Sequence, residues 1–268
     1  MKKLKVLELF AGTRSIGKAF EKNGHEVFSV EWDKKFEDID LYEDVLKVTA
    51  KDILEKFGRP DVIWANPDCT TYSVAAISKH RRRNKETGNL DPITEYAIFC
   101  DTVNNHVLDL IKELNPTYYF IENPRGAMRK MSWMQNIPRY TVTYCQYGER
   151  RMKPTDIWTN HPKPQFKPPC KNGDKCHDAA PRGSKTGTQA IKGAVEKARI
   201  PTKLCEHIVE ICENQGEIMN IGALNLLNKH KKHITQQEFR TIQGQIKAGN
   251  EYGAIKGLNR LLRKKGLA

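Results

Sequence analysis

A cysteine and a glutamate each stand at the end of an apolar run that predicts a buried strand. Cys69 follows Asp61–Ala65 after a short turn, and Glu122 follows Thr117–Ile121 directly. The carboxyl ends of parallel strands meet at one edge of a sheet, so we expect both side chains there. A thiolate can add to C6 of a pyrimidine if an acid acts at N3, and this addition makes C5 nucleophilic. The pair therefore suits substitution at C5 of a pyrimidine ring.

Neighbouring residues could tune this pair. Backbone donors or a cation such as Arg151 would lower the pKa of the Cys69 thiol. Asn123 and Pro124 follow the acid and would fix the turn that carries it. A cysteine taken alone is more often a small buried apolar residue. The prediction therefore depends on the cysteine and the acid together.

A second group of residues lies at the first two expected strands. Phe10-Ala11-Gly12 forms a strand-to-helix turn, and the second strand ends in Glu31 followed by Trp32. An acid there can accept both hydroxyls of a ribose, and an indole can lie against adenine. Asp44 could accept from the adenine amino group. The turn lacks GxGxxG and a basic pair for phosphates, so a nucleoside cofactor such as S-adenosylmethionine fits best.

Short apolar runs alternate with helical patterns over the first 125 residues, which predicts an α/β fold with a doubly wound parallel sheet. The expected strands are 4–9, 26–31, 61–65 and 117–121, with a further pair, 140–146 and 154–160, at the sheet edge. The expected helices are 15–23, 50–57 and about 92–114, the last with a proline at its first position.

The composition favours a polyanionic partner. Lys and Arg number 45 against 32 Asp and Glu in 268 residues, a net charge of +13, which suits phosphate neutralisation. No run of about 18 apolar residues or signal peptide is found, so we expect no membrane segment and a cytoplasmic protein. Seven irregularly spaced cysteines predict reduced thiols.

Four motifs occur in the order and spacing of DNA cytosine C5-methyltransferases, so residues 1–160 resemble that family. The motifs are Phe10-Ala11-Gly12, Glu31-Trp32-Asp33, Pro67-Asp68-Cys69 with Ser73, and Leu110-Ile111-Lys112 with Pro116 and Glu122-Asn123. Tyr147-Gly148 with Arg151-Met152-Lys153 resembles a later element of the family, and Arg199-Ile200-Pro201 resembles the segment that closes its cofactor pocket.

The resemblance implies a Rossmann-like class I S-adenosylmethionine-dependent methyltransferase fold of a compact phage or bacterial type. It implies methyl transfer to C5 of a cytosine flipped out of double-stranded DNA. Cys69 would attack C6, Glu122 would act at N3, and Arg151 with Lys153 would support the acid and the base's O2. The cofactor would be held by Phe10, Ala11, Gly12, Glu31, Trp32, Asp44, Asn66 and Pro67. We expect a monomer that serves DNA methylation or restriction-modification in a bacterial cell or phage-infected host.

Residues 73–90 are polar and basic, and by the resemblance they would form a mobile loop that closes over the flipped base. The expected nucleic-acid contacts are Ser73, His80, Arg81, Arg82 and Arg83. Some positions depart from the family pattern: Thr13-Arg14-Ser15 replaces glycines, Asp68-Cys69-Thr70 replaces Pro-Cys-Gln, and Arg151-Met152-Lys153 replaces Gln-x-Arg.

The rest of the chain predicts three further parts. Residues 161–200 are rich in Pro, Gly, Lys and Cys, and we expect an irregular basic segment that recognises the target. Residues 201–215 predict a helix that closes the core. Residues 216–268 carry ten Lys or Arg against three Glu and show helical spacing, which predicts a basic helical appendage.

Cys170, Cys176 and His177, with Cys145 or His161, are candidates for a zinc site. The usual CxxC spacing is absent, so we expect free thiols rather than a bound metal.

Three other functions stay open. Asn66-Pro67-Asp68-Cys69 can be aligned with the Asn-Pro-Pro-Tyr of exocyclic amino methyltransferases, which modify adenine N6 or cytosine N4. The same C5 chemistry could act on RNA, because base flipping does not distinguish the sugar. A methyltransferase fold without catalysis could also serve as a DNA-binding module.

Overall fold

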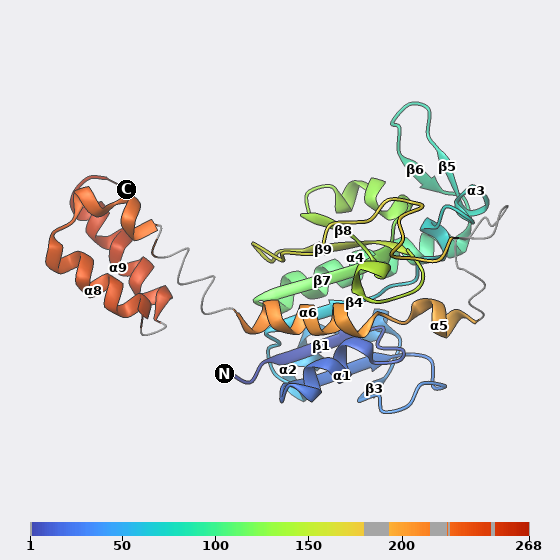
Figure 1. The fold of residues 1–268 in the computed structure, drawn as a ribbon, viewed down its shortest axis with the longest axis horizontal. Coiled ribbons are helices and arrows are strands. Elements are labelled where there is room, and N and C mark those ends of the chain that lie inside the picture. Colours follow the sequence, from blue (N-terminus) through green and yellow to red (C-terminus); the bar gives the residue numbers. More distant parts are fainter. Residues whose placement is uncertain (1, 180–192, 215–223, 225, 248–249, 268) are drawn as a thin grey trace. The chain divides into compact units, whose positions relative to one another are not determined.

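A computed structural model describes residues 2–179, 193–214, 224, 226–247 and 250–267 (Figure 1). The chain forms two compact units, Met1–Val209 and Glu210–Ala268. None of the described helices is long and apolar enough to span a bilayer.

A seven-stranded sheet forms the centre of the first unit, in the order β3-β2-β1-β4-β7-β9-β8 (Figure 1). The strands β3, β2, β1, β4 and β7 are parallel, and β9 pairs antiparallel with both β7 and β8. Their bounds are β1 Lys5–Leu9, β2 Glu26–Glu31, β3 Leu41–Tyr42, β4 Val62–Ala65, β7 Tyr118–Pro124, β8 Arg139–Thr143 and β9 Pro154–Thr159. This arrangement confirms the predicted α/β fold with its strand pair at one edge.

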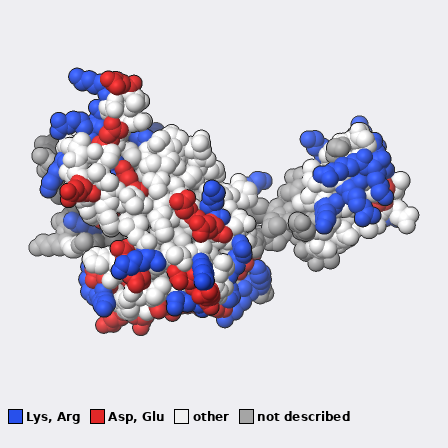
Figure 2. Space-filling model, turned by 180° about the vertical axis from the view of Figure 1, so that it is seen from behind, with Lys and Arg blue, Asp and Glu red and all other residues white. Residues whose placement is uncertain are grey.

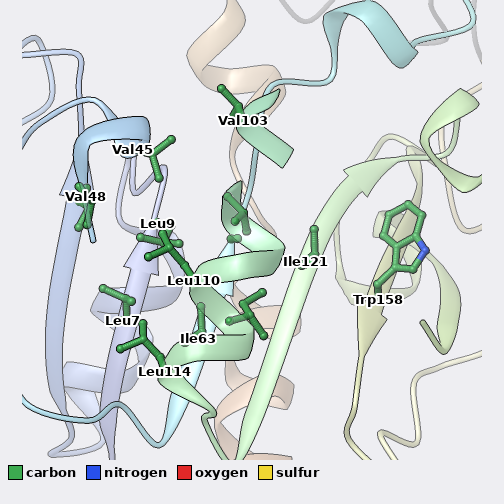
Figure 3. Close-up of a cluster of buried hydrophobic side chains, with 14 of the residues drawn as sticks. Leu7, Leu9, Val45, Val48, Ile63, Val103, Leu110, Leu114, Ile121 and Trp158 are labelled. Carbon is green, nitrogen blue, oxygen red and sulfur yellow. The ribbon is translucent and has the colours of Figure 1, made fainter. Parts of the chain in front are cut away.

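Helices cover both faces of the sheet, as in other doubly wound folds. They are α1 Ser15–Lys22, α2 Ala50–Lys56, α4 Glu95–Leu114, α5 Ala194–Ala198 and α6 Thr202–Glu213. Side chains from α4, including Leu110 and Leu114, pack onto Leu7, Leu9 and Ile63 from the sheet (Figure 3). Burial on both faces explains why the central strands are almost wholly apolar.

The structure corrects two expectations for the region before α4. The helix begins at Glu95 rather than near Pro92, because the Thr94 hydroxyl accepts a hydrogen bond from the Ala97 N–H and caps it. Pro92 instead ends β6 (Leu90–Pro92), which pairs with β5 (Arg81–Arg83) in a hairpin. Residues 73–90 are therefore not a plain loop, since they include α3 (Ile77–His80) and most of this hairpin.

The second unit is a small helical body with its own core. The helices α8 (Gln236–Lys247) and α9 (Glu251–Lys264) pack on each other. Their apolar side chains, with those of nearby residues, form a core of Leu227, Ile234, Ile242, Ile246, Ala254, Leu258 and Leu262. Lys and Arg gather on the visible face of this unit (Figure 2). Residues 160–179 of the first unit form no helix or strand.

Candidate active site

A cavity of about 800 Å³ opens at the carboxyl ends of β1, β2, β4 and β7. The order of strands reverses between β1 and β4, and such a switch point leaves a crevice where open α/β sheets bind ligands. The cavity is lined by Glu31 and Trp32 after β2 and by Cys69 and Glu122. The residues proposed for cofactor and for chemistry therefore share one space.

Cys69 lies in a turn that neighbouring groups hold in place. The Asn123 side chain donates to the Pro67 carbonyl at 3.0 Å, and the Asp68 carboxylate accepts from the Thr70 N–H at 2.7 Å. Asn123 thus ties the Cys69 turn to the strand that carries Glu122.

The pKa of the Cys69 thiol corrects an expectation from the sequence. Burial raises this pKa to about 11, the negative charges of Asp68 and Glu122 add to the rise, and Lys153 opposes it. The expected lowering by Arg151 does not occur, because the guanidinium of Arg151 is directed elsewhere. The free protein therefore holds Cys69 as a thiol.

Glu122 is a buried acid on β7 with two polar neighbours. The Tyr144 hydroxyl donates to Glu122 Oε1 at 2.8 Å, and Lys153 Nζ lies 3.9 Å from the same oxygen. Burial raises the pKa of Glu122, and Lys153 and Tyr144 partly offset this rise. A raised pKa favours the protonated carboxyl, which is the form that can donate to a ring nitrogen.

Arg151 and Lys153 have different surroundings. The buried Arg151 guanidinium donates to the carbonyls of Lys197 and Arg199, both at 3.1 Å, and to that of Glu196 at 3.2 Å. It thereby fastens the chain around α5 beside the cavity. Lys153 donates to the Lys197 carbonyl at 3.0 Å and remains near Glu122. Of the two cations, Lys153 is the one that the structure brings to the acid.

The segment after Cys69 is clamped to α4 by Arg81. The Arg81 guanidinium donates to both Asp101 oxygens, at 2.7 and 3.0 Å, and lies 4.2 Å from the Tyr72 ring centroid. The Tyr72 carbonyl also passes so close to Gly126 that a Cβ there would lie 2.4 Å from its oxygen. These contacts hold the chain on both sides of the cavity.

The five expected nucleic-acid contacts are therefore divided. Ser73 lines the cavity, and Arg82 and Arg83 are exposed on the β5–β6 hairpin. His80 and Arg81 are buried, His80 against the Thr94 hydroxyl at 3.0 Å and Arg81 in its ion pair. In this conformation neither of the two can reach a phosphate, because each already fills an internal polar contact.

The cofactor end of the cavity is built around the Glu31 carboxylate. It accepts from the N–H groups of Gly12, Trp32 and Asp33, each at 3.0 Å, so its position is fixed by backbone. The Trp32 side chain is 69% exposed, which leaves its indole free to pack against a ligand. Gly12 has a φ of 50°, a left-handed conformation that favours glycine.

These residues fit a nucleoside cofactor that lacks phosphates. The lining contributed by the turns after β1 and β2, namely Phe10, Ala11, Gly12, Thr13, Ser15, Trp32 and Phe36, contains no Lys or Arg. A carboxylate beside an exposed indole suits a ribose and an adenine. Asn66 and Pro67 line the cavity too, whereas Asp44 lies outside its lining and accepts from the Leu46 N–H at 3.0 Å.

Two residues beside this site were not predicted as functional. Glu8 lines the cavity from within β1 and is 2% exposed; its Oε1 accepts from the Gly17 N–H at 3.0 Å. Burial raises the pKa of Glu8 to about 7. An acid inside an otherwise apolar central strand was the available signal for Glu8. No spacing in the sequence ties Tyr144 to Glu122.

Comparison with known proteins places the site in context. Residues 4–137, half of the chain, match the family model of the C-5 cytosine-specific DNA methylases. The solved structures similar to this chain include a DNA modification methyltransferase described as encoded within an E. coli prophage, at 18% identity and a TM-score of 0.44, covering 59% of this chain and 46% of that one.

Two further structures resemble the chain over the same share of its length. The Entamoeba histolytica methyltransferase EhMeth is 14% identical, with a TM-score of 0.43 and coverage of 59% and 53%. The S. pombe Dnmt2 methyltransferase is 13% identical, with a TM-score of 0.40 and coverage of 59% and 48%. The chain thus spans about half the length of these proteins. No curated protein matched its sequence.

Proposed function

Since the chain belongs to the C-5 cytosine-specific DNA methylase family, we propose that it transfers a methyl group from S-adenosylmethionine to C5 of cytosine in DNA. One observation carries the proposal: Cys69 and Glu122, at neighbouring strand ends, line the same cavity as Glu31 and Trp32. A nucleophile, an acid and a nucleoside site in one space are what this reaction requires.

S-adenosylmethionine supplies a methyl group bound to a positively charged sulfur. Glu31 would accept the ribose hydroxyls, and Trp32 would pack against adenine. The Phe10-Ala11-Gly12 turn and Asn66-Pro67 would line the rest of the cofactor site. The absence of Lys and Arg from the lining after β1 and β2 supports a cofactor without phosphates.

Cys69 would form a bond from Sγ to C6 of the cytosine as its thiol proton leaves to solvent. Glu122 would donate to N3, where negative charge develops, and C5 would become nucleophilic enough to accept the methyl group. Loss of the C5 proton to water and cleavage of the bond between Sγ and C6 would then restore the ring. Lys153 lies close enough to Glu122 to favour negative charge at this end of the cavity.

Both reacting groups hold protons in the free protein. A thiol whose pKa is about 11 is ionised in roughly one molecule in ten thousand at pH 7. The reactive form, with Cys69 ionised and Glu122 protonated, is therefore a minor one. The base must reach Cys69 and Glu122 together for the thiol to lose its proton productively.

Identification of the methylated product tests this proposal. The full chain is incubated with radiolabelled S-adenosylmethionine and DNA of mixed sequence, and the DNA is digested to nucleosides. We expect 5-methyldeoxycytidine, and we expect Cys69→Ser to abolish it. Cys100→Ala, which changes a buried cysteine on α4, is the control and should retain activity. Methylation at an exocyclic amino group, or activity that survives Cys69→Ser, would refute the proposal.

A further inference from the structure

Three thiols and an imidazole ring converge at the edge of the sheet in the first unit. Cys145 lies in a short 3₁₀ helix, Tyr144–Tyr147, that follows β8. Cys170, Cys176 and His177 come from the segment without helix or strand. One ligand atom from each of these four residues lies within 4.8 Å of all the others. We call them the Cys₃His cluster.

The distances within this cluster are close to those of a tetrahedral metal site. Cys145 Sγ lies 3.1 Å from Cys170 Sγ and 3.6 Å from Cys176 Sγ. His177 Nδ1 lies 3.7 Å from Cys170 Sγ and 3.5 Å from Cys176 Sγ. Zinc bound by sulfur at about 2.3 Å and by nitrogen at about 2.0 Å would place two sulfurs about 3.8 Å apart and sulfur and nitrogen about 3.5 Å apart.

We propose that the Cys₃His cluster binds one structural zinc ion. Three thiolates and one imidazole form a closed four-ligand set, which is typical of structural rather than catalytic zinc. Soft sulfur ligands in tetrahedral array select zinc over magnesium or calcium, which prefer oxygen. The ion would lie apart from the reacting pair, Cys69 and Glu122.

Local structure explains how this spacing works without a CxxC motif. Between Cys170 and Cys176 the chain makes a tight turn, in which the Asp174 carboxylate accepts from the Lys171 N–H at 2.7 Å. Gly173 has a φ of 93°, which allows the turn. The chain thereby folds back and directs both thiols to one point.

Other contacts bring that turn to Cys145. The Cys170 N–H donates to the Thr143 hydroxyl at 3.1 Å, which anchors the turn to the end of β8. The Gln146 side chain donates to Cys176 Sγ at 3.4 Å. Donors of this kind stabilise metal-bound thiolates and orient the ligands.

A zinc ion here would fasten an irregular segment beside the active site. Residues 160–179 have no ladder or helix of their own to hold them. His177 also lines the cavity, and Cys145 is followed along the chain by Gln146 and preceded by Tyr144, the residue that donates to Glu122. The metal would therefore hold part of the cavity wall and the support of the acid in fixed positions.

Metal analysis of the full chain tests the proposal. The protein is expressed in zinc-containing medium, purified with a reductant but no chelator, and analysed by mass spectrometry of its elements. We expect close to one zinc ion per chain. Cys170→Ser should reduce this content to near zero, whereas Cys69→Ser, a cysteine in the cavity but outside the Cys₃His cluster, should retain it.

A second measurement covers the case in which Cys170→Ser fails to fold. Cobalt(II) exchanged into the unsubstituted chain should produce the thiolate charge-transfer band and the intense visible bands of a tetrahedral site. The proposal is overturned if the unsubstituted chain contains no metal and cobalt produces no such bands. A disulfide between Cys145 and Cys170 in the chain as purified would overturn it as well, because a disulfide removes two of the four ligands.

Discussion

Replacing Glu122 by glutamine should change two rates in opposite directions. The negative charge of Glu122 contributes to the raised pKa of Cys69, so a neutral amide should lower that pKa and speed alkylation of the thiol. The same substitution removes the acidic proton proposed to act at N3. Methyl transfer should therefore slow, by about 10²–10⁴-fold for the loss of a general acid.

The pKa of Cys69 sets the size of the first effect. It rises from 9.0 to about 11, which leaves roughly one thiol in a thousand ionised at pH 8. A model peptide with a pKa of 9.0 would have roughly one in ten ionised at that pH. Alkylation of Cys69 in the unsubstituted chain should therefore be about a hundredfold slower than that of the peptide.

Both rates can be measured on the same protein preparations. Iodoacetamide labelling is followed by mass spectrometry of the tryptic peptide 57–79, which contains Cys69 and no other cysteine. The pH dependence of labelling reports the pKa, and single-turnover assays report methyl transfer. Glu113→Gln, an exposed residue on α4, is the control and should change neither rate.

Two results would refute this reasoning. If Cys69 in the unsubstituted chain were alkylated as fast as the model peptide, burial and the neighbouring acids could not be raising its pKa. If Glu122→Gln slowed alkylation and methyl transfer equally, the substitution would have displaced Cys69 rather than removed a charge and a proton.

Other changes test the buried carboxyl, the tight glycine and the basic C-terminal unit. Burial raises the pKa of Glu8 to about 7, so the folded state binds its proton more tightly and stability should fall as pH rises from 4.5 through 7. Glu8→Gln should remove about 2.5 kcal/mol of that fall between pH 5 and 8, measured by urea unfolding and tryptophan fluorescence; parallel curves would contradict this. Gly126→Ala should cost about 1–3 kcal/mol in the same assay, because the new Cβ would overlap the Tyr72 carbonyl, and unchanged stability would argue against that contact. Deletion of 216–268 removes ten basic and three acidic residues, so DNA affinity should depend less steeply on salt; equal slopes would exclude phosphate contacts by this unit.

The sequence predicted the positions that depend on strand ends. Cys69 and Glu122 follow apolar runs, and parallel pairing of β4 with β7 brings such positions to one edge whatever the loops do. Glu31 and Trp32 follow β2 for the same reason. These predictions needed only the period of the strands and their parallel order.

Contacts between distant segments could not be predicted in this way. The basic run that contains Arg81 looked like a surface for phosphates, yet Asp101, twenty residues later on α4, takes that guanidinium into the interior. Arg151 was expected beside the acid, but backbone carbonyls near α5 accept its hydrogen bonds. A side chain's partner depends on packing that spacing along the chain does not encode.

Cysteine spacing was misleading for a similar reason. Cys170 and Cys176 alone lack the spacing of a common zinc motif, and the sequence offered Cys145 and His161 as equal fourth members. The path of the chain past the end of β8 selects Cys145. The buried state of Glu8 also depends on the fold, because helix α1 must cover β1 before the carboxyl loses its solvent.

The most direct test of the proposed reaction is to trap its covalent intermediate. DNA containing 5-fluorocytosine cannot lose a C5 proton after methylation, so the bond from sulfur to C6 should persist. With S-adenosylmethionine, we expect a complex that survives a denaturing gel, with the modified base on peptide 57–79, and none with Cys69→Ala. Methyl transfer to ordinary DNA without any trapped complex on fluorinated DNA would contradict the roles assigned to Cys69 and Glu122.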